Sequence, residues 1–136
     1  MPRLVYAVLA NDMIVDRESG STSFIRTLEH VVTPALPARL PGVCLGTLWE
    51  LDGPGPFSVE VRLQSPSGKK TVLGRQDVQP GEARMHRLNF RLGNLAVDED
   101  GRYAVVLALI QSNSALKAAE LPLYVIKVQP QQSGTA

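Results

Sequence analysis

Apolar and polar residues alternate most regularly over residues 57–64 and 86–92. In the first of these segments the apolar positions are Phe57, Val59, Val61 and Leu63. Side chains along a strand point to opposite faces with a period of two, so this alternation predicts strands with one buried face and one face in water. After the first segment, the sequence Ser65-Pro66-Ser67-Gly68 predicts a hairpin turn leading into an edge strand over residues 71–76.

A longer apolar run occupies residues 103–110, directly after the acidic turn Asp98-Glu99-Asp100 and Gly101. Both parities of the run are apolar: Tyr103, Val105, Leu107 and Leu109 on one, Ala104, Val106, Ala108 and Ile110 on the other. A strand with two apolar faces is typical of the interior of a sheet. The run is shorter than the roughly 20 apolar residues of a membrane helix. We therefore predict a central strand that is hidden from water on both sides.

Short apolar segments between turns predict further strands over residues 4–10, 13–15, 43–51 and 116–128. Residues 24–32 also fit a helix face, but their β-branched residues and the following Pro34 favour a strand. The prolines between Pro34 and Gly42 predict a loop or outer crossing, because proline cannot donate to a sheet ladder. About eight strands predict an all-β fold, a two-sheet antiparallel sandwich that is immunoglobulin-like or a related Greek key.

The length of 136 residues predicts one sandwich domain over residues 1–128, followed by a disordered C-terminal tail over residues 129–136 that has no apolar anchor. Fourteen Lys and Arg residues against 13 Asp and Glu residues argue against a nucleic-acid partner. Cys44 is the only cysteine, which excludes an internal disulfide. The N-terminal apolar stretch is too short for a signal peptide, so we expect a cytoplasmic protein with no membrane partner.

Candidate catalytic residues are few, because the sequence contains no zinc spacing, phosphate loop, nucleophile elbow or dinucleotide fingerprint. Cys44 could pair with His30 or His86 as nucleophile and base. An activated thiol needs a nearby cation or helix N-terminus, and nothing next to Cys44 in the sequence provides one. We therefore expect a packed thiol, no enzymatic activity and no cofactor.

The acidic turn Asp98–Asp100 offers an alternative function, because carboxylate oxygens are the ligands that calcium prefers. A calcium site there would need carboxylates from a second segment, and the candidates are Asp12, Asp16 and Glu18. A small-ligand or calcium-binding sandwich is thus the alternative to an interaction module, and a solvated turn is the simpler interpretation.

Two groups of residues could form an interaction surface. Arg62, Arg87 and Arg91 share the outward parity of their strands and would form a basic face for an acidic partner if those strands are neighbours. Val106 and Ile110 belong to the second apolar face of the central run, which Ala7 and Leu9 could extend. A large exposed apolar face is typical of a docking surface. The simpler interpretations are a solvated face with cross-strand ion pairs for the arginines, and an apolar face that the chain's own loops and residues 24–32 cover. We expect a non-enzymatic protein-interaction or assembly module whose partner is another protein or a second copy, as a homodimer.

The step from Gly101 to Tyr103 has a local resemblance to the tyrosine corner of immunoglobulin-like domains. Glu99, Gly101, Tyr103 and Val105 stand where that pattern has an acid, a small residue, the tyrosine and a cysteine. In such a corner, the tyrosine ring is buried and its hydroxyl bonds to nearby backbone. Valine replaces the cysteine here, so the resemblance implies no inter-sheet disulfide.

Five features in order carry a resemblance over nearly the whole chain: the strand 4–10 followed by Asp12, the step Pro34–Pro41, the hairpin Ser65–Gly68, the pair Gly101 and Tyr103, and Leu121-Pro122-Leu123. Together they resemble a family of small, largely bacterial, uncharacterised proteins, a domain of unknown function with a β-sandwich fold. His30-Val31 stands where that family usually has a glycine. The family has no agreed activity, so the resemblance implies a fold and no site residues.

Overall fold

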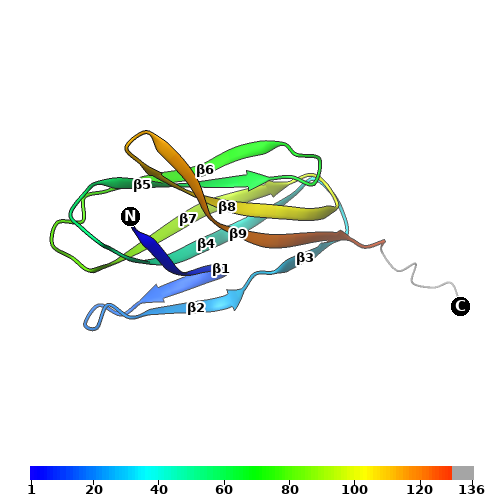
Figure 1. The fold of residues 1–136 in the computed structure, drawn as a ribbon. Helices are drawn as coiled ribbons and strands as arrows, with labels where there is room; N and C mark the ends of the chain where they lie inside the picture. Colours follow the sequence, from blue (N-terminus) through cyan, green and yellow to red (C-terminus); the bar gives the residue numbers. More distant parts are fainter. Residues whose placement is uncertain (130–136) are drawn as a thin grey trace, which may run out of the picture.

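Nine strands in two sheets make up residues 1–129, the part of the chain that the computed structural model describes (Figure 1). They are β1 (Arg3–Val15), β2 (Thr22–Thr27), β3 (His30–Thr33), β4 (Ala38–Glu50), β5 (Phe57–Gln64), β6 (Lys70–Val78), β7 (Met85–Val97), β8 (Gly101–Gln111) and β9 (Ser114–Lys127). The predicted all-β, two-sheet sandwich is confirmed. Apart from Gln129, the tail predicted over residues 129–136 lies outside the described residues. No helix in residues 1–129 is long and apolar enough to cross a membrane.

The strands are divided between sheet A, in the order β2-β1-β4-β7, and sheet B, in the order β3-β9-β8-β5-β6. Neighbouring strands are antiparallel, as predicted, except that β3 runs parallel to β9. The prediction of a single strand over residues 24–32 is wrong, because this segment contributes β2 to sheet A and β3 to sheet B. The Leu28 N–H donates to the Leu9 carbonyl, and the Glu29 carbonyl then accepts from the Tyr124 N–H. Two consecutive residues therefore transfer the chain from one sheet to the other.

The prediction of a loop over Pro34–Gly42 is also wrong in its second half, because β4 begins at Ala38 and contains Pro41. Strand β1 pairs with β4 only as far as Ala10 opposite Cys44, so Pro41 lies beyond the end of that ladder. Its missing N–H therefore leaves no ladder bond to β1 unmade. On the β7 side the register shifts between Leu40 and Val43, and Gly42 takes a φ of +72° there.

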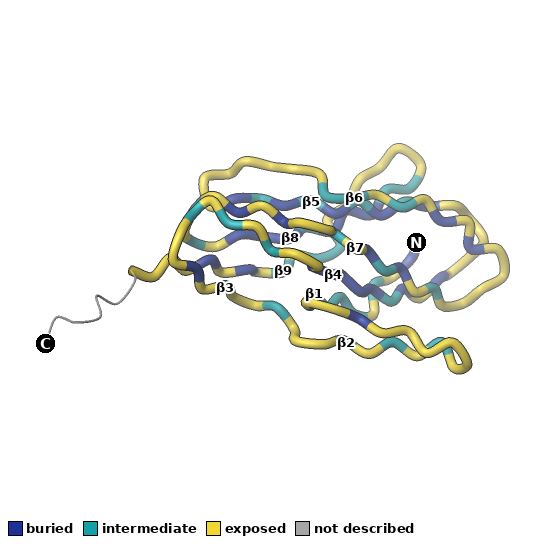
Figure 2. The backbone as a smooth tube through the Cα atoms, turned by 180° about the vertical axis from the view of Figure 1, so that it is seen from behind, coloured by how far each residue is buried: buried dark blue, intermediate teal, exposed yellow. Residues whose placement is uncertain are grey.

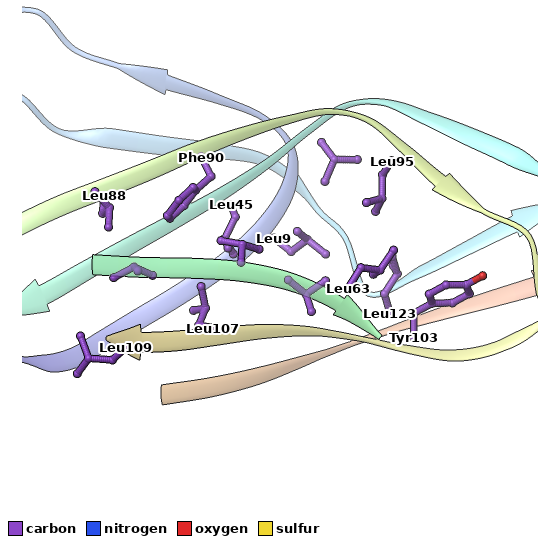
Figure 3. Packing of buried hydrophobic residues seen from close by; sticks show 14 of the residues in the cluster. Leu9, Leu45, Leu63, Leu88, Phe90, Leu95, Tyr103, Leu107, Leu109 and Leu123 are labelled. Carbon is purple, nitrogen blue, oxygen red and sulfur yellow. The ribbon is translucent and has the colours of Figure 1, made fainter. Parts of the chain in front are cut away.

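The hydrophobic core fills the space between the two sheets. Figure 3 shows side chains from both sheets pointing into this layer, among them Leu9, Leu45, Leu63, Phe90, Leu107 and Leu123. The alternation predicted over residues 57–64 is confirmed, since the buried positions of β5 are Phe57, Val59, Val61 and Leu63. Trp49 has no exposed surface and is the largest fully buried side chain of residues 1–129. Figure 2 shows the buried backbone concentrated in the inner strands, whereas β2 remains largely exposed.

The apolar run after the acidic turn forms β8, which lies inside sheet B between β5 and β9. Its inner parity is buried in the core, as predicted, with Tyr103, Val105, Leu107 and Leu109 between 0% and 4% exposed. On its outer parity Ala104 and Ala108 are buried, but Val106 and Ile110 are partly exposed. The prediction of burial on both sides therefore holds in full only for the two alanines.

The hairpin of β1 and β2 folds back over the outer face of sheet A. The second half of β1 pairs with β2 and leaves the ladder with β4, and Figure 1 shows it turning back beside β2. The Phe24 ring rests directly on Gly46 of β4, where an added Cβ would overlap the ring. Phe24 also packs edge-on against Tyr6, with ring centroids 6.1 Å apart. Glycine at position 46 thus creates the space that this hairpin occupies.

Two polar contacts hold the hairpin to β7. Arg87 Nη1 donates to the Gly20 carbonyl at 2.6 Å, and Arg91 Nη1 lies 3.6 Å from Asp12 Oδ1. Beneath the hairpin, Cys44 is 1% exposed although it belongs to the outer parity of β4. The outer face of sheet A is therefore covered over part of its area by the chain itself.

Candidate functional site

The three arginines expected to form one basic face lie on opposite sides of the molecule. Arg62 is on the outer face of β5 in sheet B, whereas Arg87 and Arg91 are on β7 in sheet A. The prediction of a single basic face is wrong because β5 and β7 are not neighbours. Both strands show the same alternation, and alternation does not encode sheet membership.

The expected apolar face is also divided between the sheets. Leu9 belongs to β1 of sheet A and is buried in the core, so it cannot extend a surface formed by β8. Val106 and Ile110 do share the outer face of sheet B. The structure therefore brings together Arg62, Val106 and Ile110, and separates them from Ala7, Leu9, Arg87 and Arg91.

A basic hollow surrounds Val106 at the middle of the outer face of sheet B. The strand register creates it, because Val106 is paired with Arg62 of β5 on one side and Glu120 of β9 on the other. Its volume is about 280 Å³, and its lining consists of Arg62, Gln64, Lys70, Val106, Lys117 and Glu120. Three cations and one carboxylate therefore line it, an arrangement suited to an anionic group.

Ion pairs arrange the long side chains around this basic hollow. Glu120 accepts from Arg102 Nη2 at 3.1 Å and from Lys117 Nζ at 3.2 Å. These two bonds hold the pKa of Glu120 below its usual value, with Arg102 the larger cause. Arg62 Nε donates to Glu60 Oε1 at 2.8 Å. Each carboxylate of this group is thus already paired, and Lys70 forms no ion pair within residues 1–129.

Small residues of β8 are buried beneath these side chains. Ala104 and Ala108, 5% and 3% exposed, lie opposite the longer side chains of Gln64 and Glu60 on β5. Long polar side chains can cover apolar surface with their stems and keep their charged ends in water. The outer parity of β8 therefore alternates two buried alanines with the partly exposed Val106 and Ile110, and it does not form a continuous apolar patch.

An apolar strip lies at one border of the same outer face. It consists of Val32, Tyr124 and Ile126, which are 55%, 48% and 43% exposed. Parallel pairing places Val32 opposite Ile126, and Tyr124 lies opposite Arg102 of β8. The sequence pattern does not indicate this strip, because Val32 and Ile126 are far apart in the chain. Locally, only the shared parity of Tyr124 and Ile126 indicates that these two side chains face the same way.

Residues 5–126 match the model of a family of unknown function, DUF6941. The chain belongs to DUF6941. The match covers nearly all of the sandwich, and it confirms the resemblance to a family of unknown function that the sequence showed. No curated protein matches the chain. The function of this DUF6941 sandwich must therefore be inferred from its own surfaces.

The acidic turn of this DUF6941 chain has its three carboxylates directed to different partners. Asp98 Oδ1 accepts from the Tyr103 hydroxyl at 3.1 Å. Glu99 Oε2 accepts from Ser67 Oγ at 2.7 Å, and Asp100 Oδ2 accepts from the Lys127 N–H at 3.3 Å. No group of three His, Cys, Asp or Glu residues within residues 1–129 could hold a metal ion. These contacts stabilise the turn and give the calcium alternative no support.

Tyr103 links this turn to the core. Its ring is 1% exposed, and its hydroxyl accepts from the N–H groups of Asp98 and Glu99, both at 3.0 Å. Burial raises the pKa of Tyr103 above its ordinary value, and the protonated hydroxyl donates to Asp98 Oδ1. Gly101 lies at the same turn and has a φ of +130°. A Cβ added at this position would lie 3.1 Å from Pro66 Cγ.

Replacing Tyr103 by phenylalanine is expected to lower the free energy of unfolding by about 1–3 kcal/mol, because two backbone N–H groups lose their acceptor. Urea denaturation followed by circular dichroism measures this change. Tyr124→Phe is the matched control, since that side chain is 48% exposed and we expect an effect below about 0.5 kcal/mol. Equal effects of the two substitutions would contradict the role of the Tyr103 hydroxyl.

Cys44 is packed, as predicted, and a cation from a distant part of the sequence lies beside it. Arg91 Nη1 lies 3.5 Å from its Sγ, because Arg91 is paired with Cys44 across β4 and β7. The two histidines are elsewhere: His86 is paired with Trp49 farther along the same ladder, and His30 lies on β3 of sheet B. The structure therefore assembles no pair of cysteine and histidine for nucleophilic catalysis.

Proposed function

We propose that this protein is a non-enzymatic interaction module that docks an acidic segment of a protein partner on the outer face of sheet B. The observation that carries the proposal is the presence of the basic hollow and the apolar strip on one open face. Protein interfaces are enriched in Tyr and Arg and combine apolar anchors with a polar rim. The outer face of sheet A is less suited to a partner, because the hairpin of β1 and β2 covers part of it.

The chemistry of this face specifies the partner segment. A carboxylate of the partner would enter the basic hollow and contact Arg62, Lys70 and Lys117, whose charges exceed that of Glu120. Apolar side chains of the same segment would cover Val32, Tyr124 and Ile126. Because the charged groups lie at the surface, we expect binding to weaken as the salt concentration rises.

A titration followed by amide chemical shifts tests this proposal. The probe is a blocked octapeptide that alternates glutamate and leucine, and the matched peptide carries lysine in place of glutamate. We expect shifts at Arg62, Val106 and Tyr124 with the acidic peptide only. Arg62→Glu should weaken binding at least tenfold, because it reverses one charge in the hollow.

The matched control is Arg17→Glu, a charge reversal in the exposed turn between β1 and β2. This variant should bind the acidic peptide as the wild type does. Equal binding of the lysine peptide, or an equal loss in both variants, would contradict an acidic partner on sheet B.

Self-association as a homodimer is a second candidate, and the apolar strip favours it because Val32 belongs to β3, the edge strand of sheet B. Exposed edge strands can pair with a second chain. Light scattering at increasing concentration distinguishes the two candidates. A dimer that Val32→Glu dissociates would identify the partner as a second copy, and a monomer at high concentration would exclude it.

Two further features belong to this proposal. A cytoplasmic location is supported by a single cysteine that forms no internal disulfide. An immunoglobulin-like relationship is supported by the bonds from the Asp98 and Glu99 N–H groups to the Tyr103 hydroxyl.

A further inference from the structure

A pocket of about 380 Å³ opens where the edge strands β6 and β7 of the two sheets face each other. These strands are not paired with each other, so the border between the sheets is open there. The inner wall of the pocket consists of core side chains, namely Leu63, Leu95, Val97 and Tyr103, which are 0–6% exposed. These side chains form the floor of the pocket, and its more exposed apolar lining residues are Pro37 and Leu73.

Polar groups line the mouth of this pocket. Lys69 comes from the turn between β5 and β6, Asn94 from β7, and Asp98 from the turn between β7 and β8. Lys69 and Asp98 are the charged residues of the lining, so the lining has no net charge. Asp98 already accepts from Tyr103, and Lys69 forms no ion pair within the described part of the chain. The lining thus offers donors at Lys69 and Asn94 and an acceptor at Asp98.

We propose that this pocket binds a small molecule that has an apolar body and no net charge. Small-molecule sites usually measure about 300–1,000 Å³ and combine mostly apolar walls with a few polar groups, and this pocket fits that description. The apolar body lies against Pro37, Leu63 and Leu73. A polar head that can both accept and donate hydrogen bonds matches Lys69 and Asp98. This site is separate from the docking face, which lies on the outside of sheet B.

Three probes that share one apolar body test the chemistry. They are 3-phenylpropanamide, which is neutral, 3-phenylpropanoate, an anion, and 2-phenylethylammonium, a cation. We expect the amide to bind at least about tenfold more tightly than either charged probe. The anion would be repelled by Asp98, and the cation would be repelled by Lys69. At ten times its dissociation constant the amide should raise the melting temperature by about 3–5 °C.

Variants locate the binding to this pocket. Thr71 is exposed, lines the pocket and is paired with the core residue Leu63, so Thr71→Trp fills the mouth and should abolish binding without unfolding the protein. Ala115→Trp, an exposed position on β9 outside the pocket, is the matched control and should leave binding unchanged. Lys69→Met should shift the preference to the ammonium probe, whereas Lys127→Met, outside the pocket, should not.

Amide chemical shifts at Leu73, Asn94 and Ala96 report the occupied pocket directly. No shift with 10 mM amide, unchanged binding in Thr71→Trp, or a charged probe that binds as tightly as the amide would each overturn the proposal. None of these results depends on the basic hollow, so the outcome is distinct from that of the proposed docking function.

Discussion

Replacing Trp49 by alanine is expected to lower the free energy of unfolding by about 3–5 kcal/mol, the usual cost of truncating a buried aromatic residue. Trp49 has no exposed surface, and its ring centroid lies 6.1 Å from that of Phe57 across the two sheets. Its Nε1 donates to Thr47 Oγ1 at 2.8 Å, and Thr47 donates in turn to the Leu88 carbonyl at 2.7 Å. The substitution therefore creates a cavity and removes one bond from this chain of hydrogen bonds.

Urea denaturation followed by far-ultraviolet circular dichroism measures this loss without relying on tryptophan fluorescence. Trp49→Phe serves as the comparison, because it keeps an aromatic ring and loses only the indole N–H and part of the volume. We expect it to cost about half as much as the alanine variant. A loss below about 1 kcal/mol for alanine would show that Trp49 is not packed between the sheets.

Replacing Gly46 by valine is expected to lower the free energy of unfolding by about 2–3 kcal/mol and to detach the hairpin of β1 and β2 from sheet A. The Cβ of any residue at this position would overlap the Phe24 ring. Hydrogen exchange should show lost protection over residues 12–25, while β5 and β8 keep theirs. Gly53→Val is the control, since nothing lies within 4 Å of an added Cβ there.

A double-mutant cycle isolates the contact between the hairpin and the sheet. Phe24→Ala removes the ring that a side chain at position 46 would overlap. The double variant should therefore lose less stability than the sum of the two single variants by about 1 kcal/mol or more. Strict additivity would mean that Phe24 does not rest on Gly46.

Local patterns predicted the parts of the fold that local chemistry determines. The period-two alternation of residues 57–64 matches the burial of β5, and the apolar run 103–110 is indeed a central strand. The turn at Ser65–Gly68 forms as expected, with Gly68 at a φ of +94° and its N–H donating to the Ser65 carbonyl. In each case the residues that determine the structure lie within a few positions of one another.

Other features depend on partners that lie far away in the sequence. Pro41 is tolerated inside β4 only because the ladder with β1 ends at Cys44. Residues 24–33 form two strands because Leu9 and Tyr124 offer backbone partners in different sheets. Neither fact is visible in the local pattern of these segments.

The candidate site likewise depends on residues that lie far apart in the sequence. The predicted outward parity of Arg62 and Val106 is confirmed, and the structure places the two residues together. Arg87 and Arg91 show the same parity but belong to the other sheet. Lys70 and Lys117 complete the basic hollow only through the register of β6 and β9 with their neighbours. Strand parity thus indicated which side chains face outward, and the sheet order decided which of them meet.

The labelling rates of single cysteines test most directly whether the outer face of sheet A is covered and that of sheet B is open. Cys44 lies beneath the hairpin on sheet A and is 1% exposed, whereas a cysteine introduced as Val32→Cys in a Cys44→Ala background lies on the open face of sheet B. We expect a thiol reagent to label Cys44 about a thousandfold more slowly, because labelling there requires an opening of the structure. Comparable labelling rates at the two positions in the folded protein would contradict a covered sheet A and an open docking face on sheet B.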